Sequence, residues 1–339
     1  MKIGEGNPED RICLVAEVGI NHEGSLDRAK ELAYEAALSG ADAVKLQTCL
    51  PEMFAPFGDR KRLKMLQDFH LSFTETENLF SWAADNRIHI FSTPLDLESA
   101  EFLASLGTLV KVSSGDITFA PLLEKLKELE VDIILSTGGS TTEEIFQALE
   151  WCSHEPQTGR SGNEVALMHC VSLYPAPVST LNLRAISDMR EAFPGRIIGF
   201  SDHSLGLDAP VIAASMGARI IEKHFTLDKQ TSGFRDHQLA LEPAELASLR
   251  SRLDTVEESL GSPKKAPGDI EQRAIAGIRR SIFFGRRVPK GSIVSLDDLA
   301  FRRPGDGMSP AAAKELVGRQ LVVDAEFGTQ AEPQMFGDV

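Results

Sequence analysis

The sequence predicts an α/β fold, a (β/α)8 TIM barrel followed by a small β-rich domain. Eight short apolar segments run through the first two-thirds of the 339 residues, and most are separated by stretches with helical periodicity. Each segment ends in residues that can do chemistry, and in a barrel the ends of parallel strands meet at one face, where active sites form. The predicted strands are residues 12–17, 43–47, 88–93, 109–114, 133–137, 165–169, 197–203 and 220–224.

Four connections between these strands carry clear helix signals. Ser25–Leu38 opens with a serine that can cap a helix. Thr74–Asn86 and Thr141–Trp151 open with threonine and glutamate in the spacing of capping boxes. Pro243–Leu260 follows the eighth strand. We therefore expect helices in these four ranges, the last of them closing the barrel.

The chain divides into a large and a small part. A barrel takes roughly 250 residues, and a stretch rich in proline and glycine begins near Gly261. We predict a barrel domain at 1–262, a linker at 263–278 and a compact β-rich domain at 279–335. Within the barrel, the connection Thr48–Ser72 is unusually long, and long loops at a catalytic face usually carry substrate contacts or lids.

Composition narrows the classes of function. The net charge of −15 argues against nucleic-acid binding, which needs a basic face. No apolar run is long enough to span a bilayer, and the first residues lack the apolar core of a signal peptide. The four cysteines show no CxxC spacing, as is typical of buried thiols in a reducing compartment. We expect a cytoplasmic protein with no membrane or nucleic-acid partner.

Two histidines mark a candidate metal site. His203 and His224 end the seventh and eighth predicted strands, which are neighbours in a barrel. Two neutral imidazoles with oxygen ligands suit Mn²⁺, Fe²⁺, Co²⁺ or Zn²⁺, whereas Mg²⁺ prefers oxygen alone. The alternative is that each histidine only satisfies the local backbone.

Two lysines mark a candidate anion site. Lys45 and Lys111 lie inside apolar segments, where an ammonium group is costly to bury unless it pairs with an anion. Strand ends nearby supply hydroxyl groups and glycine-rich turns that suit a phosphate: Thr93, Ser113–Gly115 and Ser136–Gly139. The alternative is a buried ion pair with Glu17 or Asp116.

Glu17 and Tyr174 complete the candidates that the residues themselves suggest. Glu17 ends the first strand and could bind a metal through water, act as a base, or only anchor a loop. Tyr174 opens a proline-stiffened turn after the sixth strand. Its hydroxyl could point into the mouth of the barrel, or the side chain could lie on the surface.

Together the motifs resemble those of the bacterial sialic acid synthases, over nearly the whole chain and in order. That family includes the N-acetylneuraminate, legionaminate and pseudaminate synthases of carbohydrate biosynthesis, and its C-terminal module is an antifreeze-like (SAF) domain, which Arg302–Gly307 (RRPGDG) resembles. The barrel motifs that carry the resemblance are Glu17–Ser25 (EVGINHEGS), Val44–Gln47 (VKLQ), Phe91–Pro94 (FSTP), Lys111–Gly115 (KVSSG), Leu135–Gly138 (LSTG), His169–Cys170, Tyr174–Pro175, Phe200–His203 (FSDH), Glu222–Thr226 (EKHFT) and Asp236–His237.

The resemblance implies a transferase that condenses phosphoenolpyruvate (PEP) with a 2-acetamido sugar. It makes His203 and His224 the metal ligands, normally for Mn²⁺, with Co²⁺ or Mg²⁺ as substitutes. Glu17, Lys111 and the two histidines would then be catalytic. The residues implied for PEP are Lys45, Thr93, Lys111, Ser114, Ser136, Ser172 and Ser201, and those implied for the sugar are Gln47, Tyr174, Asp236 and Arg303.

The resemblance also implies a domain-swapped homodimer, because Arg303 would reach the sugar from the SAF domain of a partner subunit. Two departures from the family pattern bear on the sugar. Ser172 stands where these synthases often have asparagine, and Asp116 stands where glutamate is usual. Two rival functions are a metal-dependent aldolase or lyase that acts without PEP, and a carbohydrate- or ice-binding SAF protein. The second leaves the polar strand ends unexplained.

Overall fold

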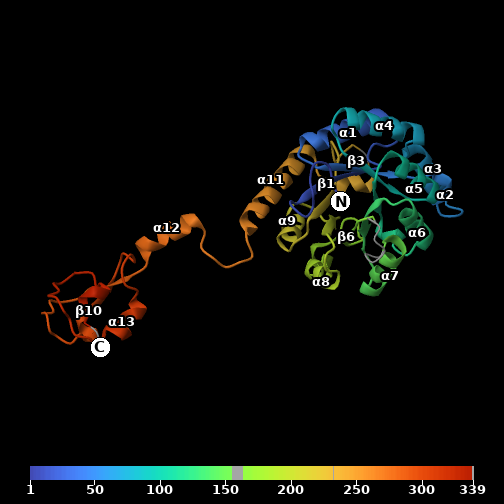
Figure 1. Cartoon of the computed structure of the whole chain (residues 1–339). Helices are drawn as coiled ribbons and strands as arrows, with labels where there is room; N and C mark the ends of the chain where they lie inside the picture. The colour runs from blue at the N-terminus through green and yellow to red at the C-terminus, as the bar shows by residue number, and fades with distance from the viewer. Residues whose placement is uncertain (155–162, 232, 338–339) are drawn as a thin grey trace. The chain divides into compact units, whose positions relative to one another are not determined.

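The computed structural model describes residues 1–154, 163–231 and 233–337, and it contains a closed barrel of eight parallel strands (Figure 1). Each strand pairs with the next along the chain, and β8 pairs with β1 to close the barrel. The predicted TIM barrel is therefore confirmed. The strands are β1 (Cys13–Gly19), β2 (Ala43–Thr48), β3 (Ile90–Pro94), β4 (Leu109–Val112), β5 (Asp132–Ser136), β6 (Val165–Cys170), β7 (Ile198–Asp202) and β8 (Ile220–His224).

Helices surround the barrel and bury their apolar faces against the strands (Figure 1). Ser25 caps α1 by accepting a hydrogen bond from the backbone N–H of Arg28, and Thr141 forms a capping box with Glu144 at the start of α7. The barrel helices are α1 (Leu26–Leu38), α4 (Phe73–Asp85), α5 (Leu97–Leu106), α6 (Ala120–Glu128), α7 (Thr142–Cys152), α8 (Ala185–Ala192), α9 (Asp208–Ser215) and α11 (Pro243–Leu260).

The long connection after β2 was expected as a loop, and the structure folds it into helices. It holds two helices, α2 (Pro51–Phe54) and α3 (Arg60–Phe69), before α4 begins. The cap of α4 also differs from expectation, because Ser72 and Glu75 form the capping box two residues before the predicted start at Thr74. A further short helix, α10 (Arg235–Leu239), lies between β8 and α11.

The interior of the barrel changes character along its length. Inward-facing side chains toward the start of the strands, among them Val15, Phe91 and Ile220, form an apolar cluster with Ile3 from the segment before β1. Side chains alternate along a strand, so every second residue points into the barrel. On β1 and β8, for example, Val15 is followed by Glu17, and Ile220 by Glu222 and His224. The sequence therefore closes one end of the barrel with apolar packing and lines the other with polar groups.

The C-terminal residues form a separate compact unit. The chain divides into Met1–Gly261 and Ser262–Val339. The second unit contains α12 (Asp269–Ile278), the antiparallel pair β9 (Ser281–Phe284) and β10 (Leu299–Arg302), and α13 (Ala313–Leu316). Its own apolar core includes Phe284, Leu316 and Phe336. Helix α12 lies within the range predicted as a linker, 263–278.

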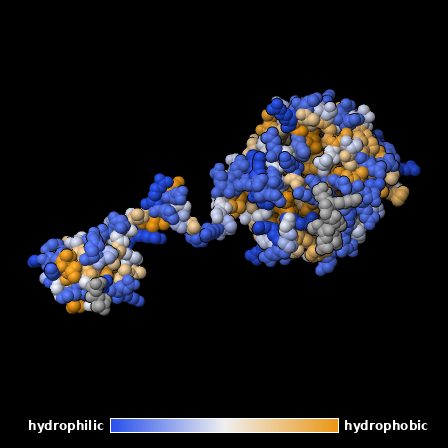
Figure 2. Space-filling view, viewed as in Figure 1, coloured by the Kyte–Doolittle hydropathy of each residue, from blue (hydrophilic) through white to orange (hydrophobic). Residues whose placement is uncertain are grey.

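The face of each unit seen in Figure 2 is mostly hydrophilic, with scattered apolar patches. Within the described ranges, no helix is at once long enough and apolar enough to cross a bilayer. The four cysteines are buried and unpaired.

Candidate active site

A cavity of about 320 Å³ opens at the polar end of the barrel. All the site residues predicted in the barrel line it, and they come from the ends of β1 to β8 and from the loops that follow. Arg303 is the one predicted site residue outside this set, because it belongs to the C-terminal unit. The lining residues predicted from the sequence are Glu17, Lys45, Gln47, Thr93, Lys111, Ser114, Ser136, Ser172, Tyr174, Ser201, His203, His224 and Asp236.

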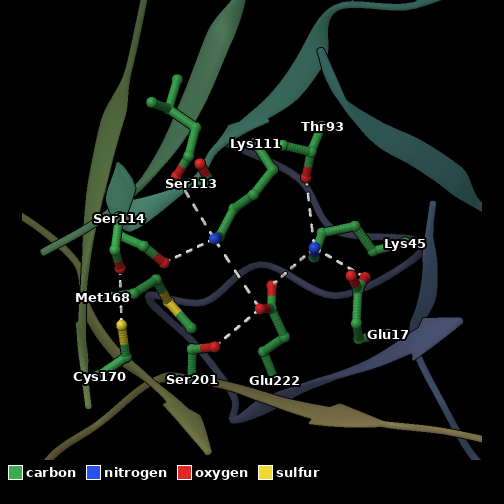
Figure 3. A network of polar contacts seen from close by, with 12 residues as sticks. Glu17, Lys45, Thr93, Lys111, Ser113, Ser114, Met168, Cys170, Ser201 and Glu222 are labelled. Atoms are coloured by element: carbon green, nitrogen blue, oxygen red, sulfur yellow. Dashed lines mark hydrogen bonds and ion pairs between the residues drawn. The ribbon is translucent and has the colours of Figure 1, made fainter. Parts of the chain in front are cut away.

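The centre of the site is a buried cluster of charges (Figure 3). Lys45 Nζ lies 2.7 Å from Glu17 Oε2 and donates a hydrogen bond to Thr93 Oγ1 at 3.3 Å. It also lies 3.8 Å from Glu222 Oε2. The ion pair with Glu17, left open from the sequence as an alternative, therefore exists inside the cavity itself.

Lys111 lies on the other side of Glu222 (Figure 3). Its ammonium is 3.8 Å from Glu222 Oε1 and donates to Ser136 Oγ at 2.6 Å. The acid partner suggested from the sequence, Asp116, instead accepts a hydrogen bond from Ser113. One carboxylate thus faces two ammonium groups, and both lysines point into the same space.

Burial shifts the pKa values of these groups. It raises the pKa of Glu17 to about 7, although Lys45 opposes the shift. It also lowers the pKa of the Lys111 ammonium. For Glu222, burial alone would raise the pKa, but the two lysines outweigh it and the pKa is lowered. Glu222 is therefore the firmly ionised carboxylate of the cluster, and Glu17 can exchange a proton near neutral pH.

Sequence reasoning missed Glu222 as a member of the site, although a signal was present. Glu222 precedes His224 by two residues, so strand alternation places both on the inner face of β8.

Phe54 and Arg62, from α2 and α3, also line the cavity. Met65 and Phe69 lie at helical spacing in α3, but that spacing did not lead us to expect a helix there. The long connection after β2 lines the cavity, and its contact with a substrate stays a prediction.

A turn that brings hydroxyl and backbone N–H groups together lines the cavity that also holds the lysines. Ser114 Oγ accepts a hydrogen bond from the Gly138 backbone N–H at 3.0 Å and lies 2.9 Å from Cys170 Sγ. A Cβ on Gly138 would come within 2.6 Å of Cys170 Sγ and of Ser172 Oγ. The glycine is therefore required for the close approach of β4, β5 and β6 at this edge. Such a cluster of hydroxyl and N–H groups beside two ammonium groups suits a multivalent anion.

The two histidines lie side by side at the mouth, with ring centroids 5.6 Å apart. His203 Nδ1 lies 2.8 Å from the Val171 carbonyl oxygen, so it donates its proton there and leaves the lone pair on Nε2. Burial lowers the pKa of His203, which keeps the ring neutral at pH 7. The ring of Tyr174 lies over His203, with centroids 4.1 Å apart.

This arrangement fits a divalent metal ion with an open coordination sphere. A metal-binding histidine normally donates its other ring N–H to a carbonyl or carboxylate, as His203 does. Among the described residues, no cluster of three or more His, Cys, Asp or Glu side chains forms a ready metal site. Two imidazoles would therefore leave positions for oxygen atoms of substrate and water.

Three of the four residues predicted for the sugar, Gln47, Tyr174 and Asp236, line the same cavity. Gln47 Nε2 donates to Glu17 Oε1 at 3.0 Å, which ties β2 to β1. Asp236, on α10, is almost wholly buried against the cavity.

Comparison with known proteins identifies the family of this chain. The NeuB family model matches residues 32–265, and the SAF domain model matches residues 279–336. The chain is 37% identical to the N,N'-diacetyllegionaminic acid synthase of Campylobacter jejuni over 91% of this chain and 95% of that protein. It is 31% identical to a pseudaminic acid synthase of the same species, over 97% of each chain.

A solved structure extends the likeness to three dimensions. The N-acetylneuraminic acid synthetase of Leptospira borgpetersenii, determined with citrate, is 31% identical and superposes with a TM-score of 0.73, over 81% of this chain and 94% of that one. The barrel, the C-terminal domain and the resemblance of the strand-end motifs now agree. The chain belongs to the NeuB family and carries a SAF domain at its C-terminal end.

Proposed function

We propose that this protein is a synthase that condenses PEP with a 2-acetamido sugar. The acceptor would be N-acetylmannosamine or a 2,4-diacetamido-trideoxyhexose, and the products a nine-carbon 2-keto acid and phosphate. One observation carries the proposal: Lys45 and Lys111 converge, with hydroxyl groups, in one cavity of a chain that belongs to the NeuB family. The reaction makes a C–C bond, so the enzyme would be a transferase.

PEP carries a carboxylate and a phosphate, and two ammonium groups match this distribution of charge. Lys45 and Lys111 would each take one anionic group, aided by Thr93 and Ser136, to which they already donate hydrogen bonds. The turn at Ser114 and Gly138 would supply further donors. Ser172 and Ser201 lie at the edge of the same space.

The acceptor sugar would occupy the mouth, beside Gln47, Tyr174 and Asp236. Mn²⁺, or Co²⁺ or Mg²⁺ in its place, would be held by His203 and His224 and would supply a Lewis acid for the open-chain aldehyde. Tyr174 would limit the space over His203. Arg303, from the SAF domain of a partner subunit in a domain-swapped homodimer, would bind the acyl group.

The bond changes follow from these positions. The C3 carbon of PEP attacks the C1 carbonyl carbon of the sugar, and positive charge develops at C2 of PEP. Water adds at C2, and Glu17, with its pKa near neutral, takes the proton that this water loses. The tetrahedral intermediate then breaks its C2–O bond to phosphate, which leaves as the anion, and its C2 hydroxyl loses a proton to become the keto group. The alkoxide oxygen left by the aldehyde gains a proton and becomes a hydroxyl. Positioning and charge stabilisation supply the catalysis, because PEP itself provides the driving force.

The rival function is an aldolase or lyase that uses the histidines but not PEP. It gives no role to two buried lysines surrounded by hydroxyl groups. The test is phosphate release from PEP with Mn²⁺ and a panel of acetamido sugars. We expect release only when PEP, metal and one matching sugar are all present. Sugar cleavage or formation without PEP, and no phosphate release with any sugar, would support the rival instead.

We propose the cytoplasm as its compartment. The buried, unpaired state of Cys13, Cys49, Cys152 and Cys170 supports a reducing environment. Fractionation of cells followed by immunoblotting tests this.

A further inference from the structure

Behind the two histidines lies a second buried ion pair that the proposed chemistry does not use. Lys223 Nζ lies 2.6 Å from Asp202 Oδ2, and neither side chain is exposed to solvent. Because side chains alternate along a strand, Lys223 faces away from the cavity that Glu222 and His224 line. The pair therefore lies between the barrel and its helices and cannot touch a substrate in the cavity.

The pair lies at one defined level of two neighbouring strands, directly before the two histidines. Asp202 and Lys223 are directly paired in the register of β7 and β8. Each is followed in sequence by one of the two histidines, His203 and His224. The ion pair thus joins the two strands at the level from which both imidazoles project.

Ser204 extends this link around His203. Its backbone N–H donates to Asp202 Oδ1 at 2.8 Å, and its carbonyl oxygen accepts a short hydrogen bond from Lys223 Nζ. The backbone on both sides of His203 is therefore held by the ion pair. Its ring is held as well, because Nδ1 donates to the Val171 carbonyl oxygen.

A role in stability alone gives little reason for these residues. Burying two charges costs desolvation that their attraction only roughly offsets, and apolar residues of similar size serve stability as well. What apolar residues cannot do is fix the direction of a strand end through hydrogen bonds. The ion pair lies at the one strand pair whose ends carry both histidines.

We propose that Asp202 and Lys223 are positioning residues that set the separation and direction of the His203 and His224 imidazoles for a divalent metal ion. The inference rests on the metal site of the proposed function and deepens it. Removal of the pair should lower the affinity for the metal without a comparable effect on the lysine site, which lies on β2 and β4.

The experiment uses the full-length protein and compares two double variants. Asp202→Asn with Lys223→Met removes both charges, keeps an oxygen for the Ser204 N–H and keeps the length of the lysine stem. The matched control is Asp42→Asn with Arg250→Met. It removes a partly buried ion pair, with Nη1 to Oδ2 at 3.3 Å, near the start of β2.

Calorimetry on metal-free protein measures the Kd for Mn²⁺ and, separately, for PEP. Changing the groups that orient metal ligands typically lowers affinity about 10- to 100-fold. We expect a loss of that size for Mn²⁺ in the Asp202/Lys223 variant, and changes within about twofold for PEP and for the control. Unchanged Mn²⁺ affinity would overturn the inference. An equal loss of PEP affinity would overturn it as well, because the pair would then support the whole cavity.

Two further results also bear on the inference, an unfolded double variant and a wild-type protein that binds no Mn²⁺. If the double variant is unfolded by circular dichroism, Lys223→Arg replaces it, because the wider guanidinium keeps the charge but displaces Ser204. Lower Mn²⁺ affinity in that variant supports the inference, and unchanged affinity overturns it. Wild-type protein that binds no Mn²⁺ would overturn the metal site and this inference together, whereas phosphate release from PEP tests the proposed reaction independently.

Discussion

Glu222 lies 3.8 Å from the ammonium group of Lys111, and both side chains are almost wholly buried. The same carboxylate lies equally far from Lys45 through its other oxygen. With Glu17, the cluster contains two carboxylates and two ammonium groups. The four side chains balance one another's charges when all are ionised, so removing the charge of one leaves another uncompensated inside the barrel.

Glu222→Gln should destabilise the free protein and strengthen its response to anions. Removing one partner of a buried ion pair typically costs about 3–5 kcal/mol, because the other charge stays buried. We expect a lower Tm without ligand and a larger rise in Tm with PEP or phosphate than the wild type shows. Thermal unfolding monitored by fluorescence measures both. Glu101→Gln, which removes an exposed partner of Lys125, is the control, and equal ligand responses in all three proteins would contradict the prediction.

Lys45→Met and Lys111→Met should each weaken PEP binding. The loss of one charge-assisted hydrogen bond costs about 1.5–3 kcal/mol, which is roughly a ten- to hundredfold change in Kd. The affinity for the sugar should change little, since its predicted contacts lie at the mouth. Titration calorimetry measures both affinities, with Lys125→Met on the outer surface as control. An unaltered Kd for PEP in both variants would remove the lysines from the PEP site.

Gly138→Ala should impair PEP use while the barrel stays folded. The added Cβ would lie 2.6 Å from Cys170 Sγ and 2.8 Å from Ser114 Oγ, so side chains at the edge of the cavity must move. We expect the KM for PEP to rise about tenfold, the equivalent of roughly one lost hydrogen bond. Gly107→Ala adds a Cβ with nothing within 4 Å and should behave as wild type. Steady-state phosphate release measures the KM for PEP in each variant. A wild-type KM for Gly138→Ala would disprove the steric argument.

Arg303→Ala should reduce use of the acetamido sugar and leave folding and PEP affinity nearly intact, because an exposed arginine contributes little to stability. Arg302→Ala, the exposed neighbour, is the matched control. If Arg303 acts in trans, mixing Arg303→Ala chains with His203→Ala chains lets some dimers assemble one intact site. Activity regained after co-refolding is the expected result. No recovery, with heterodimers shown to form, would place the arginine in its own subunit's site or outside any site.

The strands were predictable because two sequence signals coincide in each of them, a short apolar run and a polar residue directly after it. An apolar run such as Ile133–Leu135 marks a buried strand, and the polar residue after it marks the open end of the barrel. The helix α11 was predictable to its first and last residue, since proline begins it and glycine follows it.

Where prediction was wrong, local pattern did not contain the deciding information. Residues 72–77 offer two capping boxes, Ser72 with Glu75 and Thr74 with Glu77, and the structure uses the first. Helix α3 buries only Leu66, although Leu63, Leu66 and Phe69 lie at helical spacing. The length of the connection favoured a loop instead. Alternation with His224 could have placed Glu222 on the inner face of β8. Its pairing with Lys111 could not be read from the sequence, because β4 and β8 are far apart in the chain.

The alternation along β8 limits how this enzyme can change over evolutionary time. Glu222 and His224 face the cavity while Lys223 faces the helices, and each has a fixed place in the polar network. Inserting or deleting one residue within Ile220–His224 would exchange the two faces at once. A change of length is compatible with the polar network only outside the strand, for example in the connection between His224 and Pro243 that carries Asp236. The length of the strand itself must stay constant for both faces to keep their residues.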